Sequence, residues 1–159
     1  TSTLADNLRY GEPEAESQSV EQAAERARLL DDVKGFPEGF STIVGERGIT
    51  LSGGQRQRTA LGRALLVSAP VLVLDDALAS VDNNTAAAIL DSIRSTDGRT
   101  IVMISHQLSA AAACDRILVM EQGRIVQQGH HSHLISTPGV YRRLWERQQA
   151  AEQLDAIAG

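Results

Sequence analysis

The sequence predicts an α/β domain with a mostly parallel sheet, on the evidence of two apolar runs and the helical pattern between them. Residues 71–74 form a continuous apolar run between Pro70 and two aspartates, which is typical of a parallel strand buried on both faces. Residues 83–94 carry apolar side chains at helical spacing, and residues 100–104 predict a second buried strand. Strand, helix and strand in alternation indicate this fold class.

The residues before the first strand have a helical pattern instead. Apolar and small side chains at helical spacing predict a helix over residues 17–32, and four glycines predict an irregular loop over residues 35–48. A further helix is expected over residues 56–68, ended by Pro70. We therefore divide the chain into a helical part over residues 1–68, an α/β part over 69–140 and a helical tail over 141–159.

Two short strands and a polar helix are expected near the end of the chain. Residues 116–120 and 123–127 are apolar runs separated by a Gln-Gly turn, a pattern that favours a β-hairpin. The polar helix is predicted over residues 141–158. His130, His131 and His133 precede it, but their spacing and the lack of a cysteine partner favour a polar loop over a zinc site.

The composition excludes several classes of protein. Of the 159 residues, 42% are hydrophobic and 22% are charged, which is typical of a globular domain and argues against wholesale disorder. The single cysteine, Cys114, excludes a disulfide scaffold. The net charge of −5 argues against nucleic acid as the main partner, because phosphate backbones are bound by clustered Lys and Arg. No apolar run approaches the roughly 20 residues of a membrane span, so direct membrane insertion is not expected.

The most informative string is Leu-Ser-Gly-Gly-Gln at residues 51–55, a glycine-rich turn that opens the helix over residues 56–68. Glycines allow a close backbone approach, and successive N–H groups at a helix N-terminus, with the Ser52 hydroxyl, form a positive cradle for phosphate. We interpret the string as an anion site. A turn that only caps the helix is the alternative.

Polar side chains follow both predicted strands at their carboxyl ends. Asp75 and Asp76 follow the first strand, and Ser105 and His106 follow the second. Open α/β sheets bind ligands at this edge, where an aspartate can hold a magnesium ion that bridges nucleotide phosphates. The alternative is a pair of strand ends that simply meet solvent.

Residues 51–55, the helix after them, the two aspartates, Asp82 and His106 together resemble the nucleotide-binding domain of ATP-binding cassette (ABC) transporters. The resemblance covers essentially the whole chain. It implies a partial RecA-like P-loop NTPase core with the ABC helical subdomain, and without the antiparallel subdomain and the P-loop strand.

The resemblance also implies a role for each motif. The signature residues Ser52, Gly53, Gly54 and Gln55 would bind ATP held by the P-loop of a second nucleotide-binding domain. Asp75 would position Mg²⁺ through water, Asp76 would be the catalytic base and His106 would contact the γ-phosphate. Asp82 would lie in the D-loop, and Glu46 in the loop that touches the transmembrane domains.

Two departures from the family pattern matter. The P-loop sequence Gly-x-x-x-x-Gly-Lys-Ser/Thr does not occur, because the only lysine is Lys34 and it has no such neighbours. We therefore expect that the P-loop would precede Thr1 and that the chain alone does not hydrolyse ATP. Asp76 stands where the family has glutamate. Its carboxylate falls roughly 1 Å short of the attacking water, a displacement that can cost about 100-fold in rate.

These features predict part of the ATPase subunit of an exporter-type ABC transporter, with ATP and Mg²⁺ as cofactors. The weak base resembles the degenerate site of heterodimeric exporters, so the expected partners are a non-identical nucleotide-binding domain and the transmembrane domains. The expected location is the cytoplasmic face of the plasma or inner membrane.

Two other functions are kept as alternatives. One is an ABC ATPase of DNA repair or chromosome organisation. The exporter-like residues 44–48 argue against it, as does the short gap between residue 55 and Asp75, which leaves no room for a long coiled coil. The other is a non-catalytic interaction or regulatory module that lends its signature to a partner.

Overall fold

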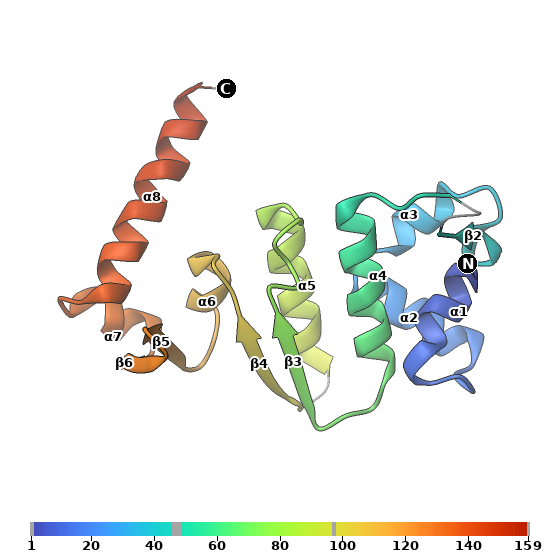
Figure 1. The fold of residues 1–159 in the computed structure, drawn as a ribbon, viewed down its shortest axis with the longest axis horizontal. Coiled ribbons are helices and arrows are strands. Elements are labelled where there is room, and N and C mark those ends of the chain that lie inside the picture. The colour runs from blue at the N-terminus through green and yellow to red at the C-terminus, as the bar shows by residue number, and fades with distance from the viewer. Residues whose placement is uncertain (1, 46–48, 97, 159) are drawn as a thin grey trace. The chain divides into compact units, whose positions relative to one another are not determined.

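The computed structural model describes residues 2–45, 49–96 and 98–158, which form two compact units (Figure 1). The first unit ends at Ile104 and the second begins at Ser105. Glu46, the expected contact to the transmembrane domains, lies outside the described residues. The divisions expected after residues 68 and 140 stay predictions.

The first unit begins with short helices around a closed apolar core. Strands β1 (Ser2–Thr3) and β2 (Ile43–Val44) pair antiparallel at one side of it. The core consists of buried side chains from the helices and from the segments that join them: Leu4, Leu8, Val20, Ala24, Leu29, Val33, Val44 and Leu51. The helical elements are α1 (Leu4–Leu8), η1 (Arg9–Gly11), α2 (Ser17–Arg26), α3 (Leu30–Lys34), η2 (Gly39–Ser41) and α4 (Gly53–Leu66).

The single helix expected over residues 17–32 is wrong, because the chain breaks at Arg28. Arg28 adopts a left-handed φ of 54°. Its N–H donates to the Glu25 carbonyl at 2.9 Å, and the Leu29 N–H donates to the Ala24 carbonyl at 2.8 Å. These two bonds form a Schellman motif at the end of α2, and the apolar contact that accompanies the motif places Leu29 in the core.

The predicted strand, helix and strand are confirmed as β3 (Val71–Asp75), α5 (Asn83–Thr96) and β4 (Thr100–Ile104). The strands pair parallel from Val71 opposite Thr100 to Asp75 opposite Ile104. Helix α5 lies along this pair, and its expected stripe is buried (Figure 1). The stripe consists of Ala86, Ile89, Leu90 and Ile93.

The expected burial of both strand faces is wrong for the described residues. Leu72 and Leu74 are buried, whereas Val71, Val73, Val102 and Ile104 are about half exposed or more. Parallel sheets are usually covered on both faces. Among the residues that the structure describes, β3 pairs only with β4, and only the face of Leu72 and Leu74 is packed.

The second unit contains the predicted hairpin and the tail helix. Its elements are α6 (Leu108–Ala112), β5 (Ile117–Glu121), β6 (Arg124–Gly129), α7 (His131–Ser136) and α8 (Val140–Ala158). Strands β5 and β6 pair antiparallel, and Gln122 and Gly123 both have positive φ, as a type I′ turn requires. A small core of Ile117, Val119, Leu134 and Tyr141 joins the hairpin to α7 and α8.

Candidate functional site

The glycine-rich string forms the N-terminus of α4, which begins at Gly53, three residues earlier than expected. The Ser52 Oγ accepts a hydrogen bond from the Gln55 N–H at 3.2 Å, and the Gln55 Oε1 accepts one from the Ser52 N–H at 2.9 Å. This is a complete capping box. Helix geometry leaves the N–H groups of Gly53 and Gly54 without an intrahelical acceptor, and Ser52 beside them is exposed.

Asp32 of α3 holds this helix start in place. Its Oδ1 accepts a hydrogen bond from the Gln55 Nε2 at 3.1 Å, and its Oδ2 forms an ion pair with the Arg58 Nη2 at 2.7 Å. Gln55 is therefore oriented by both Ser52 and Asp32. The sequence analysis missed Asp32, whose only local signal was its place near the end of an expected helix.

The loop before Asp82 lies against the same helix start. A Cβ atom added at Gly54 would lie 3.2 Å from the Ser80 carbonyl oxygen, which is tighter than an ordinary contact. The Ser80 N–H donates to the Gln57 Oε1 at 2.8 Å. Glycine at position 54 thus permits a close approach of the loop that connects β3 to α5.

Two of the predicted acidic residues lie at the carboxyl end of β3. Asp75 is exposed, and its place in the alternation puts it on the same sheet face as Val73. Asp76 follows with a left-handed φ of 48°, a conformation that aspartate tolerates better than most residues. Its N–H donates to the Ile104 carbonyl oxygen at 2.9 Å, so β4 fixes the point where the chain leaves the strand.

Asp82 caps α5. Its Oδ1 accepts a hydrogen bond from the Thr85 N–H at 2.9 Å, and this bond holds the pKa of the Asp82 carboxyl below its usual value. The capping oxygen favours the ionised form because a carboxylate is the better acceptor. Asp82 thus has a structural task at the helix start, in addition to the role that the resemblance implies.

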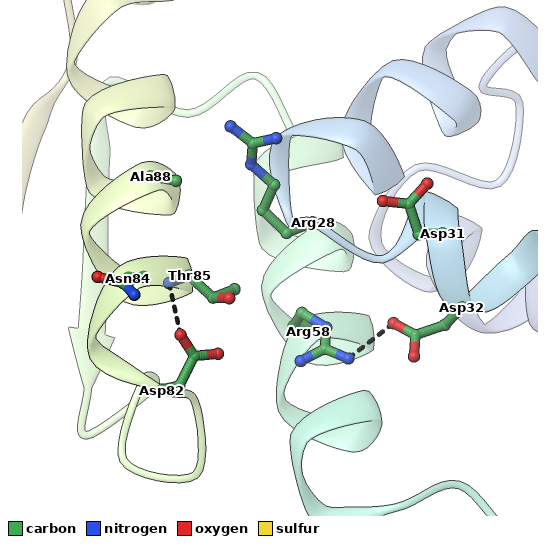
Figure 2. Close-up of a pocket in the computed structure, with 8 residues that line it drawn as sticks. All are labelled: Arg28, Asp31, Asp32, Arg58, Asp82, Asn84, Thr85 and Ala88. Carbon is green, nitrogen blue, oxygen red and sulfur yellow. Dashed lines mark hydrogen bonds and ion pairs between the residues drawn. The ribbon is translucent and has the colours of Figure 1, made fainter.

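An open cleft lies between the start of α5 and the helices α3 and α4, as Figure 2 shows. One wall is the start of α5, and the other is made by α3, α4 and the turn at Arg28. In Figure 2, Arg58 points toward Asp32, while Asp82 lies across the cleft and bonds to Thr85. The lining residues are Arg28, Asp31, Asp32, Arg58, Asp82, Asn84, Thr85 and Ala88.

The first unit therefore brings the signature string and the loop that contains Asp82 together. His106 is exposed and lies in the second unit, immediately after Ser105, whose Oγ accepts a hydrogen bond from the Gln107 N–H at 3.0 Å. Its predicted contact to a phosphate stays a prediction, as do the roles of the other site residues.

The polar loop expected at His130, His131 and His133 is wrong, because His131 and His133 lie in α7 and His130 precedes its first turn. The His131 Nδ1 lies 2.8 Å from the hydroxyl of the buried Tyr141, and its ring packs edge-on against Trp145. Burial raises the pKa of the Tyr141 hydroxyl. Within the described ranges, no group of three His, Cys, Asp or Glu side chains is arranged to hold a metal ion.

The parallel β3–α5–β4 unit, with acidic residues at its edge and a Ser-Gly-Gly helix start beside it, is a mixed α/β fragment of an ABC-type ATPase domain. Residues 1–79 match the family model described as ABC transporter. These residues belong to that family, and the chain corresponds to the C-terminal part of the nucleotide-binding domain of its exporter relatives.

Individual relatives agree over nearly the whole chain. The multidrug resistance-like ATP-binding protein MdlA of Escherichia coli is 44% identical over 154 residues, which are 96% of this chain and 26% of that protein. The probable multidrug resistance ABC transporter ATP-binding/permease protein YheI of Bacillus subtilis is 43% identical over 158 residues, 99% of this chain and 27% of that protein. The chain thus spans about a quarter of the length of these relatives.

A solved structure of a bacterial Atm1-family ABC exporter with ATP bound is similar in fold as well. The TM-score is 0.85 at 40% identity, over 92% of this chain and 26% of that one. No helix in the part of this chain that the structure describes has the length and apolar character to cross a membrane.

Proposed function

We propose that this chain provides the signature half of a composite ATP site in an ABC exporter. Ser52, Gly53, Gly54 and Gln55 would close on the γ-phosphate of an ATP molecule held by the P-loop of a second nucleotide-binding domain. The observation that carries the proposal is the start of α4. There the capping box does not use the N–H groups of Gly53 and Gly54, which lie beside the exposed Ser52. The transport role is supported by the names of two similar proteins, a probable multidrug resistance ABC transporter and a bacterial ABC exporter.

The strand edge would serve a second ATP site of the same transporter. Asp75 would position Mg²⁺ through water, and His106 would contact the γ-phosphate. Asp76 would act as a weak base, because its carboxylate is one methylene shorter than that of glutamate. Carboxylate oxygens are the ligands that Mg²⁺ prefers, and Asp75 is exposed at the end of β3, where such an ion could reach it.

The partners would be a second, non-identical nucleotide-binding domain and the transmembrane domains, and Glu46 would lie in the loop facing the latter. Closure of the two nucleotide-binding domains on ATP would drive export, with the chain on the cytoplasmic side of the membrane. The exporter relatives favour this function over an ATPase of DNA repair or chromosome organisation. A non-catalytic module would lend its signature to the same partner or regulate it, without hydrolysis at its own strand edge.

Substitution of Gly53 tests the signature role. Gly53 is the first residue of α4, and a Cβ there would meet nothing closer than 3.9 Å, so Gly53→Asp is tolerated by the fold. An acidic group at a helix N-terminus also favours the helix. In the full-length transporter, we expect Gly53→Asp to lower ATP hydrolysis about 100-fold, because it places a negative charge where the γ-phosphate must approach.

The matched control is Gly53→Asn, which has nearly the same size without the charge and should retain more activity. Binding of labelled ATP to the partner's P-loop should persist in both variants. Unchanged hydrolysis by Gly53→Asp would exclude the proposed contact.

Substitution of Asp76 tests the weak base. In the full-length transporter, Asp76→Glu should raise the rate of ATP hydrolysis, because the longer side chain reaches the attacking water. Asp76→Asn, which lacks a basic oxygen, should not raise it. A rate for Asp76→Glu that stays at the level of the unsubstituted protein would argue against a defective base at this position.

A further inference from the structure

We propose that Gln57 is a positioning residue that couples the signature residues at the start of α4 to the loop that carries Asp76 and Asp82. The inference rests on the proposed function and deepens it. When residues 52–55 move, Gln57 transmits this movement to the end of β3, where Asp75 and Asp76 lie.

The contact that carries the inference is the hydrogen bond from the Ser80 N–H to the Gln57 Oε1, at 2.8 Å. It joins residues 23 positions apart in the sequence. Gln57 lies three residues after Gly54, so both face the same side of α4. Gly54 approaches the Ser80 carbonyl and Gln57 binds the Ser80 N–H. One face of α4 therefore contacts both backbone polar groups of Ser80.

The loop between the two aspartates is stiff enough to transmit a displacement. It consists of two successive turns, in which the Ala79 N–H donates to the Asp76 carbonyl and the Val81 N–H donates to the Leu78 carbonyl, at 3.2 and 3.1 Å. Leu78 and Val81 are buried and fix the turns to the core. A shift of Ser80 is therefore passed toward both Asp76 and Asp82 and is not absorbed within the loop.

The helix start is equally well held on its other side. Gln55 and Arg58 both bind Asp32, which ties the start of α4 to α3. When the signature residues close on a phosphate, α3 and the start of α4 would move together. Gln57 then passes this movement to Ser80, because its side chain lies between the helix and the loop.

The consequence is a specific kinetic effect. Loss of the Gln57 acceptor leaves the signature residues in place, so ATP still binds. The loop no longer follows the helix, and Asp76 is misplaced at the second ATP site when the signature residues close on the first. A misplacement of about 1 Å can cost about 100-fold in rate, so a partial loss of alignment should cost about tenfold.

The experiment compares Gln57→Met with Gln57→Glu in the full-length transporter reconstituted in lipid vesicles. Every variant and the reference carry Asp76→Glu, because the weak base at Asp76 would otherwise contribute little to kcat. Methionine fills the same space without an acceptor for the Ser80 N–H, whereas the glutamate carboxylate still accepts. We expect Gln57→Met to lower kcat about tenfold with a KM for ATP within about twofold, and Gln57→Glu to stay within about twofold of the reference kcat. A merely structural role would lower the thermal stability of Gln57→Met and would not separate kcat from KM.

A second pair of variants tests the other end of the bond. Ser80→Pro removes the N–H, whereas Ser80→Ala retains it. We expect Ser80→Pro to lower kcat as Gln57→Met does, Ser80→Ala to have little effect, and the double variant Gln57→Met with Ser80→Pro to be no worse than either alone.

Three results would overturn the inference. The first is a kcat of Gln57→Met equal to that of the reference transporter, and the second is a loss of kcat in Gln57→Glu as large as in Gln57→Met. The third is a loss in the double variant equal to the sum of the two single losses in free energy. ATP hydrolysis by the unsubstituted transporter together with its loss in Gly53→Asp would show, in those cases, that the proposed function stands without the coupling. A transporter that hydrolyses no ATP would overturn both.

Discussion

The helical part of the first unit and the β3–β4 pair bury their apolar side chains in different ways. In the helical part, Leu4, Leu8 and Leu29 have no exposed surface, and they pack with one another in a core that the helices and their connecting segments enclose. In β3, Leu74 is 3% exposed and its neighbour Val73 is 60% exposed. These three leucines are thus enclosed by neighbouring elements on all sides, whereas in the strand pair burial depends on which face of the sheet a side chain occupies.

The difference follows from the geometry of the two kinds of element. A helix has one apolar stripe, and a few short helices can turn their stripes toward a common centre. A sheet has two faces, and successive side chains point to opposite ones. Helix α5 lies along the β3–β4 pair (Figure 1). Val73 and its register partner Val102 are exposed on the sheet face opposite to that of the buried Leu72 and Leu74.

The largest expected effect is a difference in stability between substitutions on the two faces of β3. Leu74→Ala should lower the free energy of unfolding by about 2–5 kcal/mol, because it removes buried methyl groups and leaves a cavity. Val73→Ala should cost less than about 1 kcal/mol, since that side chain is mostly in water. Urea denaturation followed by circular dichroism measures both. Equal losses would mean that both faces of β3 are packed in solution, and the comparison would then fail.

The elements that the sequence predicted best are those with a local signal. The parallel strands follow from two apolar runs, the hairpin from its Gln-Gly turn, and α5 from a stripe that is buried as expected. The start of α4 was placed three residues too late, because glycine has a low helix propensity. The available signal was the Ser-x-x-Gln pattern of Ser52 and Gln55, which is a capping box.

The features that could not be predicted depend on residues far apart in the sequence, or on which elements pack against each face of the sheet. Asp32 lies 23 positions before Gln55, and no periodic pattern connects them. Gln57 and Ser80 are equally far apart, so their bond is visible only in the structure. An apolar run such as residues 71–74 indicates a strand, but it does not say which elements cover its two faces. The motif at residues 51–55 was recognised from the sequence because its residues are contiguous.

The smallest expected effect concerns the break that ends α2. A Schellman motif usually has glycine at the left-handed position, and here Arg28 occupies it with a φ of 54°. No glycine signal was therefore available, and one continuous helix was expected. Arg28→Gly should raise the free energy of unfolding by about 0.5–1 kcal/mol relative to Arg28→Ala, because glycine adopts this conformation without the steric cost of a Cβ atom.

The alanine variant is the control because it removes the same charge from the cleft but retains the Cβ atom. Urea denaturation of the two variants measures the free-energy cost of the left-handed conformation for a residue with a Cβ atom. An Arg28→Gly variant less stable than Arg28→Ala would contradict this conformation. A positive difference would show that the helical part owes its closed core to a sharp turn formed against the local preference of its residue. Burial of Leu29, the next residue, supplies the compensating free energy, which the exposed face of β3 lacks.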